Sequence, residues 1–123
     1  CMVPYDEVHC DKEHLEKALA EVKRLQNDVL PHLKARDCHE LREALEVQSM
    51  VLVAEMILRS ELFREESRCG VRRKDFPLMD NVNWLKWIGL EKHKDGMKIF
   101  TEEIPTPYYK VPLEVKYPTV NRL

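Results

Sequence analysis

A nine-residue segment, Met50 to Leu58, places the strongest constraint on the fold of this chain. Eight of its residues are apolar, and Glu55 is the exception. The spacing around it predicts one long helix over about residues 38–66, on the order of 29 residues, which is longer than most globular helices. A helix that is apolar on all sides must be covered on all sides. We therefore expect a third element, or a second protein surface, to cover it, with Leu52 and Leu58 among the most buried side chains.

A first helix is expected before it, over about residues 11–30. Apolar residues recur there at steps of three and four, which forms one apolar stripe. Asp11 is placed to cap the start of this helix, and Pro31 disfavours helical geometry at its end. Asp37 and Glu40 form an aspartate version of a capping box at the start of the long helix. The two helices should therefore form an antiparallel pair with a short connection.

After Pro77 the periodicity changes from helical to strand-like. The runs 84–91 and 97–101 are rich in aromatic and aliphatic residues, and the turn between them contains Asp95 and Gly96. This arrangement predicts a β-hairpin with Gly96 at positive φ. The last part of the chain should be an extended tail, because its prolines exclude a helix. These prolines are Pro105, Pro107, Pro112 and Pro118.

The predicted fold class is mainly α, with an antiparallel, spectrin-repeat-like bundle of about three helices followed by the hairpin and the tail. A length of 123 residues allows one hydrophobic core. We expect residues 1–77 to form the bundle, and residues 78–123 to pack on it as part of the same domain.

Charge and hydropathy exclude several classes of partner. The chain has 20 basic and 22 acidic residues, so no positive field draws in nucleic acid. The longest apolar run ends at Glu55, far short of a membrane span, so we expect no direct membrane insertion. The first residue is Cys1, with no signal-peptide pattern after it. We expect the chain to be a piece of a larger protein.

The cysteines and histidines favour free thiols over a metal site. Four cysteines stand far apart without a Cys-x-x-Cys pair, which is typical of a reducing compartment. Cys10 and His14 lie one helical turn apart, and Cys38 and His39 are adjacent. The first helix would hold these two groups about 30 Å apart, too far for one ion. We therefore predict no metal ligands.

No catalytic or cofactor-binding motif is present in the sequence, and we predict no residue of either kind. A phosphate-binding glycine loop, a Gly-x-Ser-x-Gly elbow and a His-Glu-x-x-His pair are all missing. Glu55 has two interpretations: an ion pair with Arg59 one turn later, or a buried acid with a raised pKa. Trp84 and Trp87 are expected to anchor the hairpin on the helices.

Residues 64–77 concentrate charge at the end of the long helix. They hold five basic and three acidic side chains before Phe76 and Pro77 stop the segment. Arginines and carboxylates clustered at a chain reversal predict either a knot of paired charges or a docking surface. We expect Arg68 and Arg73 to pair with Glu66, Asp75 or backbone carbonyls. Of the two, we predict an internal role for Arg73 and a docking role for Arg68. The predicted docking and structural residues are Arg64, Glu66, Arg68, Arg73, Asp75 and Trp84.

The same region resembles the C-terminal domain of a flavoprotein family. The family contains the flavoprotein subunits of succinate dehydrogenase and fumarate reductase, with adenylylsulfate reductase and L-aspartate oxidase as relatives. Its typical pattern is Arg-x-Glu-Ser-Arg-Gly-x-His-x-Arg-x-Asp-Phe-Pro, shortly before Asn-Trp. The resemblance covers about residues 37–104. Cys69 stands in place of the usual glycine and Val71 in place of the usual histidine. The matching residues are Arg64, Glu66, Ser67, Arg68, Arg73, Asp75, Phe76, Pro77, Asn83 and Trp84.

This resemblance implies a supporting role rather than chemistry. In the family, FAD and the substrate belong to domains that precede the helical one. The expected partner is therefore the FAD-binding domain of the same parent chain, and an iron–sulfur subunit is a further candidate. The parent is expected to be a cytoplasmic FAD-dependent oxidoreductase, or one held peripherally at the inner face of the membrane. The fragment alone should bind no FAD and catalyse nothing. The missing histidine leaves the substrate open among succinate, fumarate and others, including a sulfur compound.

Two other classes of function remain open from the residues. A free-standing helical adaptor would show the same amphipathic first helix, with few exposed apolar side chains. A small metal-binding regulator would use the cysteines and histidines near the ends of the bundle.

Overall fold

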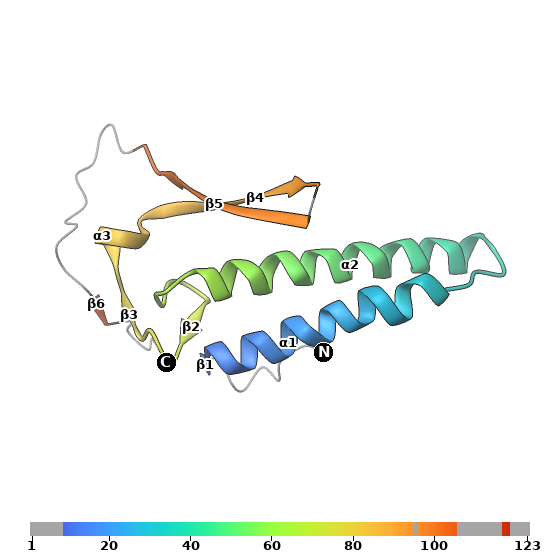
Figure 1. The fold of residues 1–123 in the computed structure, drawn as a ribbon, viewed down its shortest axis with the longest axis horizontal. Coiled ribbons are helices and arrows are strands. Elements are labelled where there is room, and N and C mark those ends of the chain that lie inside the picture. The colour runs from blue at the N-terminus through green and yellow to red at the C-terminus, as the bar shows by residue number, and fades with distance from the viewer. Residues whose placement is uncertain (1–8, 95, 106–116, 119–123) are drawn as a thin grey trace.

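The two long helices lie side by side and run in opposite directions (Figure 1). The structure is a computed structural model, and it describes residues 9–94, 96–105 and 117–118. Helix α1 spans Lys12–Arg24 and helix α2 spans Cys38–Phe63. The predicted antiparallel pair is therefore confirmed, and the segment from residue 50 to 58 is helical throughout.

The caps at the helix starts follow the sequence. Asp11 accepts a hydrogen bond from the backbone nitrogen of His14, at 3.0 Å. Asp37 accepts from the backbone nitrogens of His39 and Glu40, at 2.8 and 2.9 Å. Glu40 reaches back past the cap residue to the backbone nitrogen of Arg36, at 2.8 Å. These side chains bind backbone donors that a helix start leaves without a partner.

Helices α1 and α2 both end earlier than the sequence predicts. After α1 the chain winds as a π-helix, η1 (Leu25–Val29), and then as a 3₁₀ turn, η2 (Leu30–His32), which contains Pro31. Helix α2 ends at Phe63 rather than near residue 66, because Arg64 already has extended geometry. The charged segment that follows has hydrogen-bond partners of its own, described below.

The strands join parts of the chain that are far apart in sequence. Strand β1 (His9–Cys10) pairs in parallel with β2 (Arg72–Arg73), which ties the start of α1 to the segment after α2. Strand β3 (Leu78–Met79) pairs antiparallel with β6 (Tyr117–Pro118). Residues 106–116 and 119–123 of the predicted tail lie outside the described residues.

The predicted hairpin is present. Strands β4 (Lys86–His93) and β5 (Gly96–Glu103) pair antiparallel from end to end, and Gly96 has a φ of 127°. The hairpin runs beside α2 on the side away from α1 (Figure 1). A third helix, α3 (Asn81–Trp84), forms a single turn before the hairpin. The described chain is thus mainly helical with a hairpin, but α3 is too short to complete a spectrin-repeat-like core.

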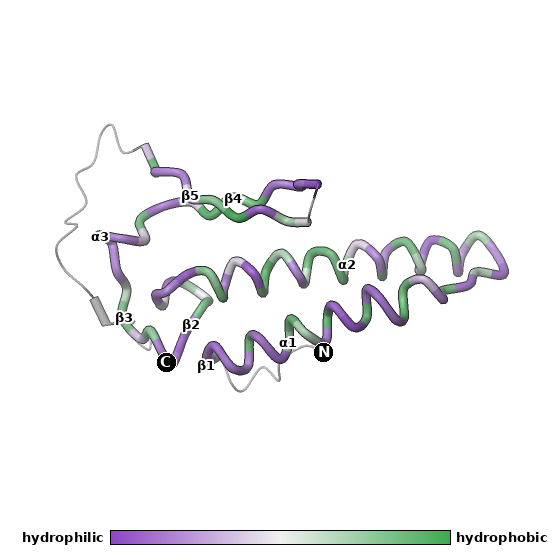
Figure 2. Tube along the Cα trace, in the orientation of Figure 1, coloured by the Kyte–Doolittle hydropathy of each residue, from purple (hydrophilic) through white to green (hydrophobic). Residues whose placement is uncertain are grey.

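The apolar interior is small, and much of α2 is uncovered. Among the described residues, Leu15 is the one apolar side chain that is buried, with 4% of its surface exposed. Leu58 is half-buried, but the prediction for Leu52 is wrong, because half of its surface is exposed. The helix that packs along α2 is α1, and one neighbour covers only one side of a helix. Figure 2 shows apolar residues along α2 and the hairpin and a more hydrophilic α1.

Within the described part of the chain, no helix combines the length and apolar character needed to cross a bilayer.

The exposed fractions of Leu15 and Leu52 predict which of the two leucines contributes more to stability. Leu15→Ala should lower the free energy of unfolding of the 123-residue chain by about 2–5 kcal/mol, because it opens a cavity at a buried position. Leu52→Ala removes an exposed side chain and should have a much smaller effect. Urea unfolding of both variants, followed by far-UV circular dichroism, measures the difference. Equal losses of stability would contradict this arrangement.

Candidate docking site: the charged knot and the apolar face of helix α2

The segment after α2 folds into a compact cluster of buried charge, here called the charged knot and defined by residues 64–68, 73–75 and 80–81. It lies where α2 ends, next to the start of α1 and the root of the hairpin (Figure 1). Its most buried side chains are polar, whereas a protein interior is normally apolar. These side chains are Glu66, Ser67, Arg73, Asp80 and Asn81.

Arg73 closes the end of α2. The residue is 2% exposed, and its Nη1 donates to the carbonyl oxygens of Glu61, Leu62 and Arg64 at 3.0, 3.0 and 2.8 Å. These carbonyls belong to the last turn of α2 and to its cap residue, where helical partners run out. A cation at this end also opposes the negative pole of the helix. Arg73 therefore acts as the C-terminal cap of the long helix.

The other side of the Arg73 guanidinium faces Asp75. Nε donates to Asp75 Oδ1 at 3.0 Å, and Nη2 donates to Oδ2. This hydrogen-bonded pair lowers the pKa of the Asp75 carboxyl. The predicted pairing of Arg73 with Asp75 and with backbone carbonyls is confirmed.

Glu66 is the centre of the second half of the knot. Its side chain is completely buried and accepts hydrogen bonds from three groups. Arg68 donates from Nε and Nη2 at 2.7 and 3.0 Å, the backbone nitrogen of Asp80 donates at 2.9 Å, and Arg64 donates from Nη1. A buried carboxylate is tolerated only when charge and hydrogen bonds compensate its desolvation, as they do here. The predicted pairing of Arg68 with Glu66 is confirmed.

Arg68 makes inward contacts of the same kind as Arg73. Besides Glu66, its Nη2 donates to Asn81 Oδ1 at 2.7 Å. Its side chain is 22% exposed, compared with 1% for Arg73. The geometry therefore supports an internal role for Arg68, and its docking role stays a prediction.

Ser67 links the two halves of the knot. Its hydroxyl accepts from the backbone nitrogen of Arg73 at 2.8 Å and donates to the carbonyl of Phe76 at 2.7 Å. The backbone of Arg68 and Val71 then closes a tight turn through two hydrogen bonds. Cys69 lies in this turn with a φ of 54°, which is unfavourable for a side-chain-bearing residue. A glycine would adopt this conformation at no such cost.

Arg64 and Trp84 connect the knot to the hairpin. Arg64 donates from Nη1 to the carbonyl of Trp84 and from Nη2 to the carbonyl of Lys86, both at 3.0 Å. Its guanidinium lies 5.8 Å from the centre of the Trp84 ring, and Phe63 meets the same ring edge to face at 5.6 Å. Trp84 therefore anchors the hairpin as predicted. Trp87 does not, since 52% of its surface is exposed.

All six predicted residues meet at this end of the molecule, and the sequence analysis missed two others. Asp80 caps α3 by accepting from the backbone nitrogens of Val82 and Asn83, at 3.1 and 3.3 Å. Asn81 accepts from Arg68, as described above. An aspartate immediately before a short helical stretch is a cap signal, so Asp80 could have been found. Asn81 carried no such signal.

Glu55 forms a separate polar contact between the helices. Its Oε2 accepts from Gln26 Nε2 at 2.6 Å, and its Oε1 accepts from Arg59 Nε at 2.7 Å. Burial would raise the pKa of Glu55, but these two hydrogen bonds outweigh it and lower the pKa. The predicted pair with Arg59 is confirmed, and the alternative of a raised pKa is wrong.

The cysteines and histidines do not gather in the described part of the chain. No group of three His, Cys, Asp or Glu residues in that part is arranged to hold a metal ion. Cys10 lies against β2, with Sγ 3.5 Å from the carbonyl oxygen of Arg72, and burial raises the pKa of its thiol.

The remaining surface of α2 is apolar and exposed. Leucines spaced four and seven residues apart form one stripe along α2. Apolar residues spaced three and four residues apart form a second stripe on a different side of the helix. Each of these six side chains has at least half of its surface exposed. A continuous apolar surface on a helix marks an interaction site. The two stripes are Leu41, Leu45 and Leu52, and Met50, Val53 and Ile57.

The Arg73 cap predicts a large effect on stability. Arg73→Ala should lower the free energy of unfolding of the 123-residue chain by about 3–5 kcal/mol, because it removes a buried side chain and leaves three partly buried carbonyls without their donor. Arg24→Ala breaks only an exposed pair with Glu21 and should cost about 0–1 kcal/mol. Chemical unfolding of both variants at pH 7 compares them. A small effect of Arg73→Ala would show that the end of α2 does not depend on this cation.

A second prediction concerns pH. Burial raises the pKa of Glu61, and the positive charge of Arg73 offsets this only in part. A carboxyl with a raised folded-state pKa destabilises the fold once the pH is high enough to ionise it. Glu61→Gln should therefore raise the melting temperature at pH 7, and this gain should vanish as the pH falls below about 4.

The exposed neighbour provides the control for this pH effect. Glu65→Gln changes the same charge at a position with no such burial, and it should leave the melting temperature nearly unchanged at both pH values. A gain for Glu61→Gln that is the same at pH 7 and pH 4 would contradict the assignment.

Comparison with known proteins supports the resemblance. The family described as "Fumarate reductase flavoprotein C-term" matches residues 1–118. An uncharacterized FAD-dependent oxidoreductase of Methanocaldococcus jannaschii is 30% identical over 76 residues, which are 62% of this chain and 14% of that protein. The FrdA chain of a mutant E. coli quinol fumarate reductase has the same fold, with a TM-score of 0.76 at 21% identity. That match covers 84% of this chain and 19% of FrdA.

The chain thus spans less than a fifth of the length of both relatives. The match to the family covers nearly all of the chain, and the charged knot lies within it. This chain belongs to the family of fumarate reductase flavoprotein C-terminal domains.

Proposed function

We propose that this chain is the structural and docking domain of a larger FAD-dependent oxidoreductase of the fumarate reductase and succinate dehydrogenase type. It packs on the FAD-binding and capping domains of its parent and is not catalytic alone. Residues 1–77 and 78–123 act together as one domain in this role. FAD belongs to the parent rather than to this part of it.

The observation that carries the proposal is the uncovered surface of α2. Burying a leucine side chain in an interface stabilises that interface by about 1.5–3 kcal/mol. Helix α2 exposes both apolar stripes, so covering them would stabilise a contact with another surface. A free-standing adaptor would be expected to have few such side chains in water. The adaptor is therefore the weaker candidate, and no cluster of metal ligands in the described residues supports a metal-binding regulator.

The charged knot has a supporting part in this function. It fixes the end of α2, the start of α1 and the root of the hairpin in one arrangement, so that the docking surface has a defined shape. Arg64, Glu66, Arg68, Arg73, Asp75 and Trp84 are the residues that we assign to it. A second subunit with iron–sulfur clusters would complete the electron path of such an enzyme, in the cytoplasm or at the inner face of the membrane.

The test is a charge placed in the apolar surface. In the full-length parent, Leu52→Asp should lower the bound FAD per polypeptide and reduce the melting temperature by several degrees, because it buries an unpaired carboxylate in the contact. The same change in the 123-residue chain should have little effect, since Leu52 is exposed there. Visible absorbance of the purified enzyme measures the flavin.

Ala20→Asp is the matched control, because Ala20 is exposed on α1, outside the apolar stripes of α2. It should leave flavin content and melting temperature close to those of the unmodified parent. A parent that keeps its full flavin content and stability with Leu52→Asp would refute the docking role.

A further inference from the structure

Strand β5 has one edge without a strand partner. It bonds to β4 along its full length, and no other strand pairs with it in the part of the chain that the structure describes. No other element of that part makes extensive backbone contact with β5. The edge of a sheet presents a row of N–H and C=O groups that can pair with a further strand. The eight residues of β5 therefore offer a template for one more strand.

The register shows which residues of β5 present these backbone groups. His93 and Gly96 are paired on either side of a two-residue loop, and such a closing pair exchanges its backbone hydrogen bonds. Because the bonds alternate along an antiparallel ladder, every second residue from Gly96 onward bonds to β4. The residues between them direct their backbone groups away from β4. They are Met97, Ile99, Thr101 and Glu103.

The residues of β5 that bond to β4 place their side chains on one face of the hairpin. This face, here called the outer face, is defined by Lys98, Phe100 and Glu102 of β5 and Trp87 of β4. All of these side chains are exposed. Within the described residues neither Lys98 nor Glu102 forms an ion pair. Along β5 the outer face thus presents a cation, an aromatic ring and a carboxylate, in that order.

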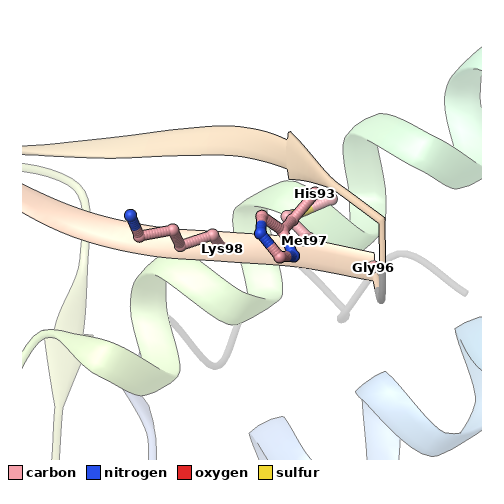
Figure 3. Close-up of a pocket in the computed structure, with 4 residues that line it drawn as sticks. All are labelled: His93, Gly96, Met97 and Lys98. Atoms are coloured by element: carbon pink, nitrogen blue, oxygen red, sulfur yellow. The ribbon is translucent and has the colours of Figure 1, made fainter.

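The outer face is accessible at the tip of the hairpin. An open pocket of about 400 Å³ is lined there by His93, Gly96, Met97 and Lys98, and the Lys98 side chain lies along β5 (Figure 3). By the register, His93, Gly96 and Lys98 share the outer face, whereas Met97 belongs to the opposite one. The end of β5 that carries Lys98 is therefore open to solvent.

The order of charges on β5 fits a second copy of the same strand. Two β5 strands that pair antiparallel around Phe100 place Lys98 of each copy opposite Glu102 of the other, because the arrangement has two-fold symmetry. The two Phe100 rings then meet at the centre. Opposite charges and aromatic pairs that face each other across an antiparallel pair stabilise it. In this register the outward backbone groups of Ile99 meet those of Thr101, so backbone and side chains agree.

Neither a shifted register nor the edge of β4 offers the same match. A shift of two residues is the smallest that keeps the backbone bonds, and it removes both ion pairs. In β4 the one carboxylate, Glu91, lies on the face opposite to Lys86 and Lys92, so two β4 strands cannot set opposite charges against each other. Charge complementarity therefore specifies both the strand and the register.

We propose that two copies of the parent protein associate through the edges of β5, with Phe100 on the two-fold axis and the two hairpins joined into one four-stranded sheet. This contact goes beyond the docking role of α2, because it uses a different element and a different partner. The edge of one strand is small compared with the roughly 1,200–2,000 Å² of a stable protein interface. We therefore expect a weak dimer that forms and dissociates reversibly.

Reversal of the charges in the full-length parent tests this arrangement. Lys98→Glu sets carboxylates against carboxylates at both ends of the contact, and Glu102→Lys sets ammonium groups against ammonium groups. Each change alone should raise the dissociation constant of the dimer by about tenfold or more, as sedimentation velocity over a range of concentrations measures. The two changes combined in one chain restore opposite charges and should restore the dimer.

A mixture of the two single variants gives a result that misfolding cannot imitate. Glu102→Lys in one copy supplies the cations that Lys98→Glu in the other copy requires. The mixture should therefore form heterodimers at concentrations where neither variant dimerises alone. Lys92→Glu is the matched control, because it makes the same change of charge on β4 and on the opposite face of the hairpin. It should leave the dimer unchanged.

Three results would overturn the proposal. A full-length parent that stays monomeric at every concentration has no such contact, and a dimer that Lys98→Glu leaves intact uses another surface. A mixture of the single variants that stays monomeric would show that the two charges do not face each other. Flavin content separates this contact from the docking role, since Lys98→Glu should leave it unchanged whereas Leu52→Asp should lower it.

Discussion

The guanidinium of Arg73 is the contact on which the rest of the structure depends. It binds three carbonyls at the end of α2 and the carboxylate of Asp75 at once, so the longest helix and the chain that follows it end in one place. The same residue lies in β2, which pairs with β1 at the start of α1. Removing this cation would leave several partly buried acceptors without donors, which costs more than the loss of an exposed ion pair.

Glu66 extends this arrangement to the hairpin. A fully buried carboxylate is unfavourable unless its charge is matched, and Arg64 and Arg68 match it from two sides. Arg64 also donates to the backbone carbonyls of Trp84 and Lys86. The buried charges of the knot therefore fix the direction in which β4 leaves it. Specific polar geometry, rather than a large apolar core, therefore sets the positions of α1, α2 and the hairpin at this end of the molecule.

The apolar residues have a different use. Leu15 is buried, but both apolar stripes of α2 are exposed. A fold that placed its charged groups inside and left its leucines outside would be unsuited to standing alone in water. In the docking role that we propose, the same arrangement provides a rigid end and an apolar contact surface. This division is the physical basis of that proposal.

The sequence by itself determined the local structure. Asp11 and Asp37 specify the helix starts, the period of three to four specifies the helices, and Gly96 specifies the hairpin turn, because each acts through neighbours along the chain. Ionic partners two or four residues apart, such as Arg73 with Asp75 and Glu55 with Arg59, were also predictable. The clustering of charge from Arg64 to Asp75 also predicted a group of paired charges, which the structure shows.

Only the tertiary structure decided which surfaces are covered. Nothing local distinguishes Leu15, which is buried, from Leu52, which is exposed, since both lie on apolar stripes. Trp84 and Trp87 are three residues apart, yet one packs against Phe63 and the other faces outward. Asn81 meets Arg68 only because the chain reverses between them. Burial depends on which distant segments of the chain meet, and the local sequence does not specify these contacts.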